Sequence, residues 1–294
     1  MDTQSMRAFV EVAKTASFSH AAEALHLTQP AISKRIARLE EQLDTRLFDR
    51  IGRHVHLTEA GEAFLPRCQR VLSDIQDAER LIHGLDGRIE GSLSMGISHH
   101  IGLHRLPPVL RRFTQQHPDV RLDIDFMDSE QAHQRILQGE LDLAVITLAP
   151  SKEPRLEAFE VWRDPLALAV AHEHPLLDRP ADVPVTLKEL SAFTAIPPGL
   201  GTYTGQIIKQ RFDAEGLTMD IGMSTNYLET IKVMVSIGLG WSLLPLTLHD
   251  ETVTELPIAG PAWYRQLGCV YHRDRSLSNA ARAFIDELKR EAGL

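Results

Sequence analysis

The feature that most constrains this chain is the segment 16–53, in which two helical patterns flank a tight turn and a basic hairpin follows. Ser19 is placed to cap the first helix, and the turn is predicted at 26–28 with Leu27 buried beneath it. Thr28 is the expected N-cap of the second helix, and Pro30 falls in its first turn, where a missing N–H costs nothing. This spacing predicts a helix-turn-helix, whose second helix enters the major groove of DNA.

The second helix has two different faces. Apolar residues recur at steps of four, three and four from Ile32 to Leu43 and form one stripe. The opposite face carries short or hydrogen-bonding side chains suited to base edges, and nearby arginines are available for phosphates or the minor groove. The predicted DNA-binding residues are Thr28, Gln29, Pro30, Ser33, Lys34, Arg35, Arg38, Arg50 and Arg53. A plain amphipathic helix with a solvated face is the alternative, but the cap, turn, proline and hairpin together favour DNA binding.

The charge distribution is compatible with an N-terminal DNA-binding domain despite a net charge of −9. Residues 1–58 hold 8 Lys and Arg against 7 Asp and Glu, whereas the remainder holds 23 against 33. Because the charge on the groove-facing surface governs DNA affinity, the acidic remainder limits non-specific binding and does not exclude DNA. The sequence has neither a signal-peptide pattern nor an apolar run of membrane-spanning length, so we expect a cytoplasmic protein with no membrane partner.

A long helix is predicted from Thr58, its cap, to about Ile82. Its apolar residues alternate steps of four and three, the spacing of a coiled-coil seam: Phe64, Cys68, Val71, Ile75, Ala78 and Ile82. This helix either packs on its own domain or pairs two subunits, and pairing would let two recognition helices face successive turns of one groove. The glycine-rich, charged segment 84–91 has no helical pattern and is expected to be a hinge.

After the hinge, short apolar strands alternate with helical segments, a pattern typical of parallel strands joined by helical crossovers. Strands are expected at 93–97, 120–126, 141–146, 166–171, 193–196, 222–224, 241–244 and 268–271. Helices are expected at 103–116, 130–138, 202–215, 228–237 and 278–291. The predicted fold class is α/β, with two lobes and a cleft between them, preceded by an N-terminal all-α winged helix-turn-helix.

The cleft is the expected ligand site, because ligands of open α/β sheets bind beyond the carboxyl ends of strands, at helix N-termini that favour carboxylates. The candidate effector-binding residues are Ser98, His99, His100, Thr147, Pro197, Gly199, Thr202, Tyr203, Thr225 and Asn226. Each serine or threonine among them could equally be a plain helix cap. No arginine falls at these points, so a monoacid or a neutral aromatic compound is favoured over a tightly held dicarboxylate.

Other chemistries have weaker support. Neither His99–His100 nor His172–His174 has helical i, i+4 spacing, and no cysteine or carboxylate partner lies close in sequence, so we expect no metal site. No strand end gathers a nucleophile, a base and an orienting group, which disfavours an enzyme. A solute-binding transport module is disfavoured because the sequence lacks a signal peptide. Cys68 and Cys269 are far apart in sequence, and we interpret both as buried structural thiols.

The run SFSHAAEALHLTQPAISKRIARLEEQLDTRLFDR, followed by HLTEAGEAFL, resembles the N-terminal signature of the LysR-type transcriptional regulators. The length of 294 residues fits this family, and the rest of the chain matches more loosely, by pattern. The resemblance implies a DNA-binding domain at 1–58, a linker helix with a hinge at 59–91, and a regulatory domain at 92–294 that resembles a periplasmic binding protein. Lobe 1 would take about 92–162 and 267–294, and lobe 2 about 163–266.

The resemblance also implies a function and partners. We expect a transcriptional regulator without a cofactor, which binds double-stranded promoter DNA and a small anionic or aromatic effector between its lobes. Positions matching Ser98, Thr147 and the Thr202 region line the effector pocket in this family. A homodimer through the linker helix, a homotetramer and contact with RNA polymerase are the expected assemblies. Some relatives sense oxidants through paired cysteines, which leaves a redox role for Cys68 and Cys269 as an alternative.

Overall fold

The computed structural model describes residues 2–51, 54–83, 87–180 and 182–294. The chain divides into two compact units. One comprises Met1–Asp86 with the short segments Gln138–Glu140 and Arg275–Leu277, and the other comprises the remainder. Within the described ranges, no helix has both the length and the apolar character that crossing a membrane requires.

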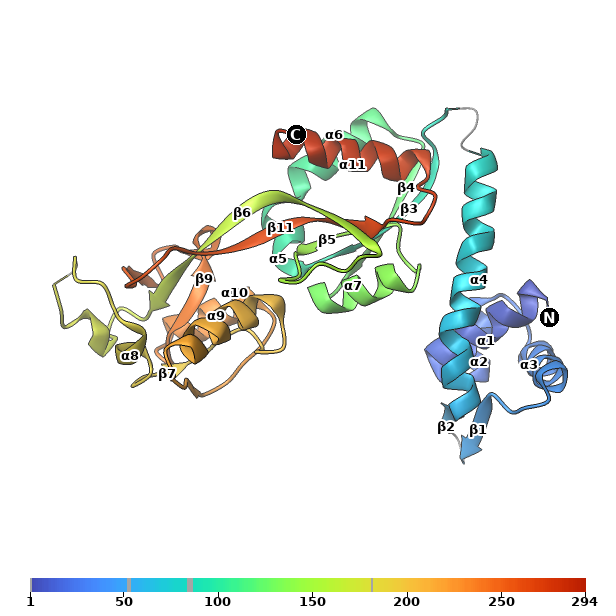
Figure 1. Cartoon of the computed structure of the whole chain (residues 1–294), viewed down its shortest axis with the longest axis horizontal. Helices are drawn as coiled ribbons and strands as arrows, with labels where there is room; N and C mark the ends of the chain where they lie inside the picture. Colours follow the sequence, from blue (N-terminus) through green and yellow to red (C-terminus); the bar gives the residue numbers. More distant parts are fainter. Residues whose placement is uncertain (1, 52–53, 84–86, 181) are drawn as a thin grey trace. The chain divides into compact units, whose positions relative to one another are not determined.

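The N-terminal unit is a helix-turn-helix followed by a hairpin and a long helix. Its elements are α1 (Thr3–Thr15), α2 (Phe18–Ala24), α3 (Gln29–Leu43), β1 (Phe48–Ile51), β2 (His54–Leu57) and α4 (Glu59–His83), as labelled in Figure 1. Strands β1 and β2 pair antiparallel and form the predicted hairpin, which is called the wing below. The helices and the wing occur where the sequence pattern placed them.

The N-cap of α2 differs from the predicted one. Ser17 caps α2, because its hydroxyl accepts a hydrogen bond from the His20 N–H at 3.3 Å. The predicted cap, Ser19, lies inside the helix and is exposed, since the helix begins two residues earlier than a cap at Ser19 predicts. Thr28 is the N-cap of α3 and Pro30 lies in its first turn, although the Thr28 side chain makes no cap hydrogen bond within the described part of the chain.

One apolar core joins the helices of this unit to the wing. Three residues of the α3 stripe are fully enclosed in it: Ile32, Ile36 and Leu39. Phe9 of α1 lies at the centre, with its ring centroid 5.3 Å from that of Phe48 and 5.2 Å from that of Phe64. Burial of the stripe fixes the rotation of α3 about its axis, so the opposite face of this helix points to solvent.

The long helix predicted after Thr58 is α4, which continues through Pro66. The Thr58 hydroxyl accepts a hydrogen bond from the Gly61 N–H at 3.0 Å and so caps the first turn.

The apolar seam of α4 has two parts. Phe64 and Cys68 pack against the core of the N-terminal unit, and Cys68 is only 1% exposed. Further along the helix, Val71 is 41% exposed and Ala78 is also exposed. The first part of the seam therefore packs within its own unit, while the second part presents apolar surface to solvent.

The second unit consists of two α/β lobes. The first lobe contains β3 (Gly91–Ile97), α5 (His99–His104), α6 (Pro107–Gln116), β4 (Val120–Phe126), α7 (Ser129–Leu137), β5 (Leu143–Thr147) and α11 (Asn279–Ala292). Strand β3 pairs in parallel with β4 and β5, as predicted. The single helix expected at 103–116 is two helices, because Pro107 and Pro108 begin a new one at α6.

The second lobe contains shorter elements. They are α8 (Leu187–Leu190), β7 (Thr194–Ala195), α9 (Tyr203–Ala214), β8 (Asp220–Ile221), α10 (Leu228–Ser236), β9 (Ser242–Pro245) and β10 (Thr254–Leu256). Single 3-10 turns occur at Pro175–Leu177 and Leu246–Leu248. Strand β8 precedes the predicted range 222–224 and pairs in parallel with β7.

Two long strands, β6 (Leu156–Val170) and β11 (Trp263–His272), run side by side between the lobes (Figure 1). They pair antiparallel with each other, β11 pairs antiparallel with β5, and both β9 and β10 pair antiparallel with β6. The prediction of parallel strands is therefore wrong for this part, because the chain passes from one lobe to the other along β6 and returns along β11. The register shifts between Leu267 and Gly268.

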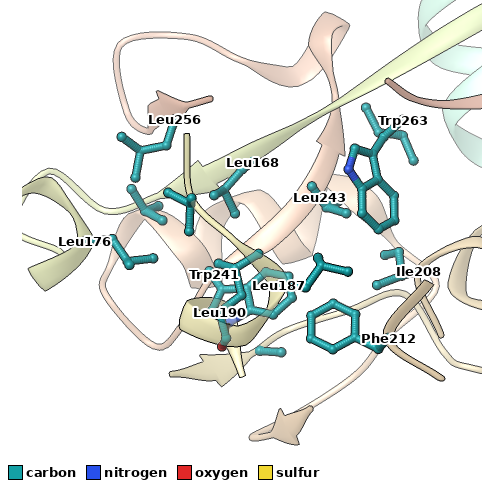
Figure 2. Close-up of a cluster of buried hydrophobic side chains, with 14 residues drawn as sticks. Leu168, Leu176, Leu187, Leu190, Ile208, Phe212, Trp241, Leu243, Leu256 and Trp263 are labelled. Carbon is teal, nitrogen blue, oxygen red and sulfur yellow. Dashed lines mark hydrogen bonds between the residues drawn. The ribbon is translucent and has the colours of Figure 1, made fainter. Parts of the chain in front are cut away.

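The second lobe has its own core, drawn in Figure 2. Trp241, which is 1% exposed, stacks on Phe212 with the ring centroids 5.8 Å apart. Its indole N–H donates to the carbonyls of Leu190 and Phe193, each at 3.0 Å. This tryptophan therefore connects α8 and the start of β7 to β9 and α9.

Candidate DNA-binding face and effector cavity

The outer face of α3 carries the side chains predicted to meet DNA. Most of them are exposed: Thr28, Gln29, Pro30, Lys34 and Arg38. Ser33 and Arg35 are half-buried, and the Gln29 amide donates to the Ser33 hydroxyl at 2.9 Å. Amide, hydroxyl and ammonium groups on one helix face are the groups that hydrogen-bond adenine and guanine edges in a major groove.

A shallow groove separates α3 from the start of α1. Its volume is about 580 Å³, and it is lined by Asp2, Thr3, Gln4, Ser5, Ala31, Lys34, Arg35 and Arg38. The Arg35 guanidinium donates to the Gln4 side-chain oxygen at 2.7 Å. The one carboxylate among the lining residues, Asp2, caps α1. Three cations against one carboxylate give the groove a positive charge, which suits a phosphate of the DNA backbone.

The wing was predicted to contribute Arg50 and Arg53. The backbone of Arg50 pairs with Val55 in the hairpin. Arg53 and the side chain of Arg50 lie outside the described residues, so their DNA contacts stay predictions.

A cavity of about 50 Å³ lies between the lobes of the second unit. The first lobe supplies residues that follow its strands, and the second lobe supplies residues around the starts of α9 and α10. The lining residues are Ser98, His99, His100, Met127, Asp128, Ser129, Glu130, Thr147, Pro198, Thr202, Thr204, Asn226, Leu228 and Arg265. Most of these side chains are polar, so the cavity is suited to a small hydrogen-bonding molecule.

Arg265 forms the cationic wall of this cavity and is 4% exposed. Its Nε donates to an Asp164 oxygen at 2.8 Å, and its Nη1 donates to the Thr204 hydroxyl at 3.4 Å. Asp164 is fully buried and also accepts from Arg105 at 2.8 Å, so two guanidinium groups share one carboxylate and one net positive charge remains. The Nη2 of Arg265 has no hydrogen-bond partner among the described residues, which leaves a buried donor available beside the cavity.

Asp128 and Glu130 form the acidic wall. Asp128 accepts from the Asn226 amide at 2.7 Å, which links the two lobes. Glu130 accepts from the backbone N–H of Tyr203 at 2.5 Å. Burial raises the pKa of Glu130, because desolvation disfavours its charged form. The cavity therefore has donors at Arg265 and acceptors at these two carboxyl groups.

The predicted effector residues divide into two groups. Several line the cavity: Ser98, His99, His100, Thr147, Thr202 and Asn226. Others lie beside these residues in the chain without being among the lining residues: Pro197, Gly199, Tyr203 and Thr225. The Thr202 hydroxyl donates to the Gly199 carbonyl at 2.7 Å and accepts from the Gly205 N–H at 3.0 Å, so it also acts as the plain helix cap considered from the sequence. Ser98 makes no such cap bond in the described structure.

No arginine falls at the strand ends and helix starts considered from the sequence, but the structure adds Arg265, which lines the cavity from β11. A signal for this residue exists in the sequence. Trp263, Arg265 and Leu267 alternate with exposed residues, so Arg265 occupies an inward position of a strand, where an unpaired charge is costly. Asp128 and Glu130 could have been found by the rule applied to the other strands, since they lie between the end of β4 and the first turn of α7.

A helix-turn-helix unit joined to a two-lobed α/β unit with a polar cavity defines the class of DNA-binding regulators that carry an effector-binding domain. Comparison with known families agrees: a model described as "Bacterial regulatory helix-turn-helix protein, lysR family" matches residues 3–62, and "LysR substrate binding domain" matches residues 86–293. The chain belongs to the LysR family of transcriptional regulators. The resemblance seen in the sequence is thereby confirmed, as is the expectation of a regulator and not an enzyme.

Individual relatives give the same result. The RuBisCO operon transcriptional regulator of Allochromatium vinosum is 30% identical over 292 residues, which cover 98% of this chain and 95% of that protein. A regulator encoded in the ibpB–leuC intergenic region of Azotobacter vinelandii, described as uncharacterized, is 61% identical over 108 residues, 37% of this chain and 75% of the relative. The structure of a full-length OxyR variant from Pseudomonas aeruginosa matches with a TM-score of 0.72 at 24% identity, covers 100% of this chain and 98% of its own, and so shares the fold.

Proposed function

We propose that the chain reads an operator half-site with the N-terminal outer face of α3. In this proposal Gln29, Ser33 and Lys34 meet base edges, and Pro30 lies on the same groove-facing side of the helix. The backbone or the minor groove is held by Thr28, Arg35, Arg38, Arg50 and Arg53. The observation that carries it is the opposite burial of the two faces of α3, with an enclosed apolar stripe and an exposed polar face. A merely solvated helix does not require a positive groove beside it, whereas a DNA-binding helix does.

The test measures binding of the full chain to the DNA upstream of its own gene, by gel shift. Lys34→Ala is expected to weaken binding by roughly tenfold or more, because a base-edge contact contributes about 1–3 kcal/mol. Ser33→Ala is expected to weaken binding less. Lys14→Ala is the matched control, since Lys14 is an exposed lysine in the last turn of α1, and it should leave affinity within about twofold. Full affinity in both α3 variants would remove this assignment of the reading face.

We also propose that the cavity binds a small carboxylic acid that carries a hydrogen-bond donor such as a hydroxyl or amino group. The carboxylate would accept from the unpartnered Nη2 of Arg265, and the donor group would face Asp128 and Glu130. The single observation that supports an acid is this buried donor, because a buried N–H without a partner costs about 1–3 kcal/mol unless a ligand satisfies it. The acidic wall supports the second group, and it disfavours a plain aromatic acid.

A thermal-shift screen of the full chain tests the effector class. The panel contains hydroxy acids, amino acids, unsubstituted acids of equal size, the corresponding amides and benzoate. A matching ligand at 100 times its Kd would stabilise the regulatory domain by about 2.7 kcal/mol. Glu130→Gln should remove the preference for acids that carry a hydrogen-bond donor over unsubstituted acids. Glu215→Gln, at an exposed position after α9, is the control. Stabilisation by the amides equal to that by the acids would contradict the role given to Arg265.

Finally, we propose that two copies pair through the exposed second part of the α4 seam, and that two such dimers form a tetramer that contacts RNA polymerase. The coiled-coil spacing and the exposure of Val71 and Ala78 support the pairing.

A further inference from the structure

We propose that His100, His104 and Glu229 form a binding site for a divalent transition-metal ion, with Zn²⁺ as the best fit, and that the ion links the two lobes. The two histidines are four residues apart on α5 and therefore share one face of that helix. Glu229 comes from the first turn of α10 in the other lobe. The expectation of no metal site rested on His99–His100 and His172–His174, and it did not consider His104.

The ligand atoms lie close to the separations that an ion requires. The His104 Nε2 is 3.0 Å from a Glu229 carboxylate oxygen, and the His100 Nδ1 is 3.6 Å from the same oxygen. One ligand atom from each of the three residues lies within 4.8 Å of the other two. Tetrahedral Zn²⁺ with bonds of about 2.0–2.2 Å holds its ligand atoms roughly 3.3–3.6 Å apart, so small side-chain adjustments suffice. Two imidazoles and one carboxylate are also a donor set typical of this ion.

The environment of His100 favours metal binding through Nδ1. The residue is 4% exposed, and its Nε2 lies 3.2 Å from the Thr247 hydroxyl oxygen. Its Nδ1 is buried and has no hydrogen-bond partner in the part of the chain that the structure describes. If Nε2 donates to Thr247, Nδ1 presents a lone pair to the Glu229 carboxylate, and two acceptors face each other. A cation between them removes this repulsion, and a hydrogen bond on the other ring nitrogen is typical of metal-bound histidine.

The charges around the three ligand residues and their exposure to solvent also suit a metal ion. The nearby Asp164 is shared by two arginines, so its charge is balanced without the cluster. Glu229 contacts the histidines and supplies the negative charge that a cation site needs. The side chains of His104 and Glu229 are 32% and 35% exposed, so an ion can enter from solvent. Because His100 also lines the effector cavity, the fourth coordination position is available to water or to a ligand carboxylate.

The experiment uses the full chain, stripped of metal with a chelator and titrated with Zn²⁺ alone in competition with a chromophoric chelator. We expect one Zn²⁺ per chain. His104→Ala and Glu229→Gln should each weaken binding at least tenfold, and Thr247→Val should weaken it by about tenfold through loss of the orienting hydroxyl. His20→Ala, at an exposed histidine of α2, is the matched control and should change the affinity less than twofold.

Two results would overturn the proposal. One is an unaltered chain that binds no Zn²⁺ at micromolar concentrations. This result does not depend on the folding of any variant. The other is unchanged binding in both ligand variants, which would place the ion elsewhere. Since the titration contains neither DNA nor an effector, a negative outcome leaves the proposed function untouched.

Discussion

The two cysteines illustrate how the surroundings of a single residue decide its chemistry. Cys68 is 1% exposed in the core of the N-terminal unit, and its Sγ lies 3.6 Å from the Met6 carbonyl oxygen. Burial raises the pKa of Cys68 to about 12, and burial also raises the pKa of Cys269, which is fully enclosed in β11. Since the thiolate is the reactive form, both residues are suited to packing and not to redox sensing.

We therefore predict that neither thiol of the native chain reacts with a thiol-specific reagent at pH 7.5. Both should react once the chain is unfolded in denaturant, because unfolding exposes the sulfurs and restores an ordinary pKa. Mass spectrometry after alkylation, with and without denaturant, measures this. Rapid modification of Cys269 in the native chain would show that the β11 interior opens readily and would revive the redox alternative.

The second residue-scale prediction concerns Trp241. Trp241→Phe removes one indole N–H that serves two carbonyls and leaves a void beside Phe212. We expect a loss of about 2–4 kcal/mol in the free energy of unfolding of the regulatory domain. Chemical denaturation followed by circular dichroism measures it. Trp162→Phe is the control, since Trp162 is only partly buried, and it should cost less than about 1 kcal/mol.

At the scale of elements, the short helix α8 depends on its cap. Thr186 and Glu189 form a capping box, and Arg179 donates to the Glu189 carboxylate at 2.5 Å. The Arg179 guanidinium and the hydrogen bonds from Thr186 lower the pKa of Glu189 from its usual 4.5 to about 2. A carboxyl group with a lowered folded-state pKa stabilises the fold above its unfolded pKa, and this stabilisation is lost as the pH falls toward 2.

Glu189→Gln is accordingly expected to lower stability at pH 7 by about 0.5–1 kcal/mol, a small effect because the Glu189 side chain is 41% exposed. The difference from the unaltered chain should shrink as the pH is lowered to about 3. Thermal unfolding at the two pH values measures both effects. Glu173→Gln, at an exposed position in the same lobe, should show neither. A difference that stays constant with pH would mean that packing, and not charge, causes the loss.

Elements with a strong local pattern could be predicted from the sequence, and others could not. Helix α3 has a periodic stripe, a cap position and a proline, and it was predicted to within one residue at its start. Strand β10 and helix α8 were missed, because three or four residues carry little periodicity. The cavity was found in part, since polar residues that follow strands are a local signal, but the Arg265–Asp164 pair joins residues far apart in sequence.

At the scale of the whole molecule, the order of strands in the sheet depends on contacts between residues far apart in the chain, and a short stretch of sequence does not contain them. The antiparallel pairing of β6 with β11 joins segments about one hundred residues apart in the chain. Assembly is a second property of this scale. The α4 seam leaves Val71 41% exposed, and an apolar side chain at coiled-coil spacing on a long helix is a typical helix-pairing surface.

Val71→Glu is therefore expected to convert a dimer into a monomer, because a charge in the seam must lose its hydration when two helices pair. Affinity for a two-half-site operator should fall at least about tenfold, since the second half-site would no longer benefit from a tethered partner. Light scattering coupled to size exclusion measures the mass, and a gel shift measures the affinity. Arg70→Glu is the control, because Arg70 is exposed on α4 outside the seam. If Val71→Glu keeps the dimer mass while Arg70→Glu breaks it, pairing involves a different face of this helix.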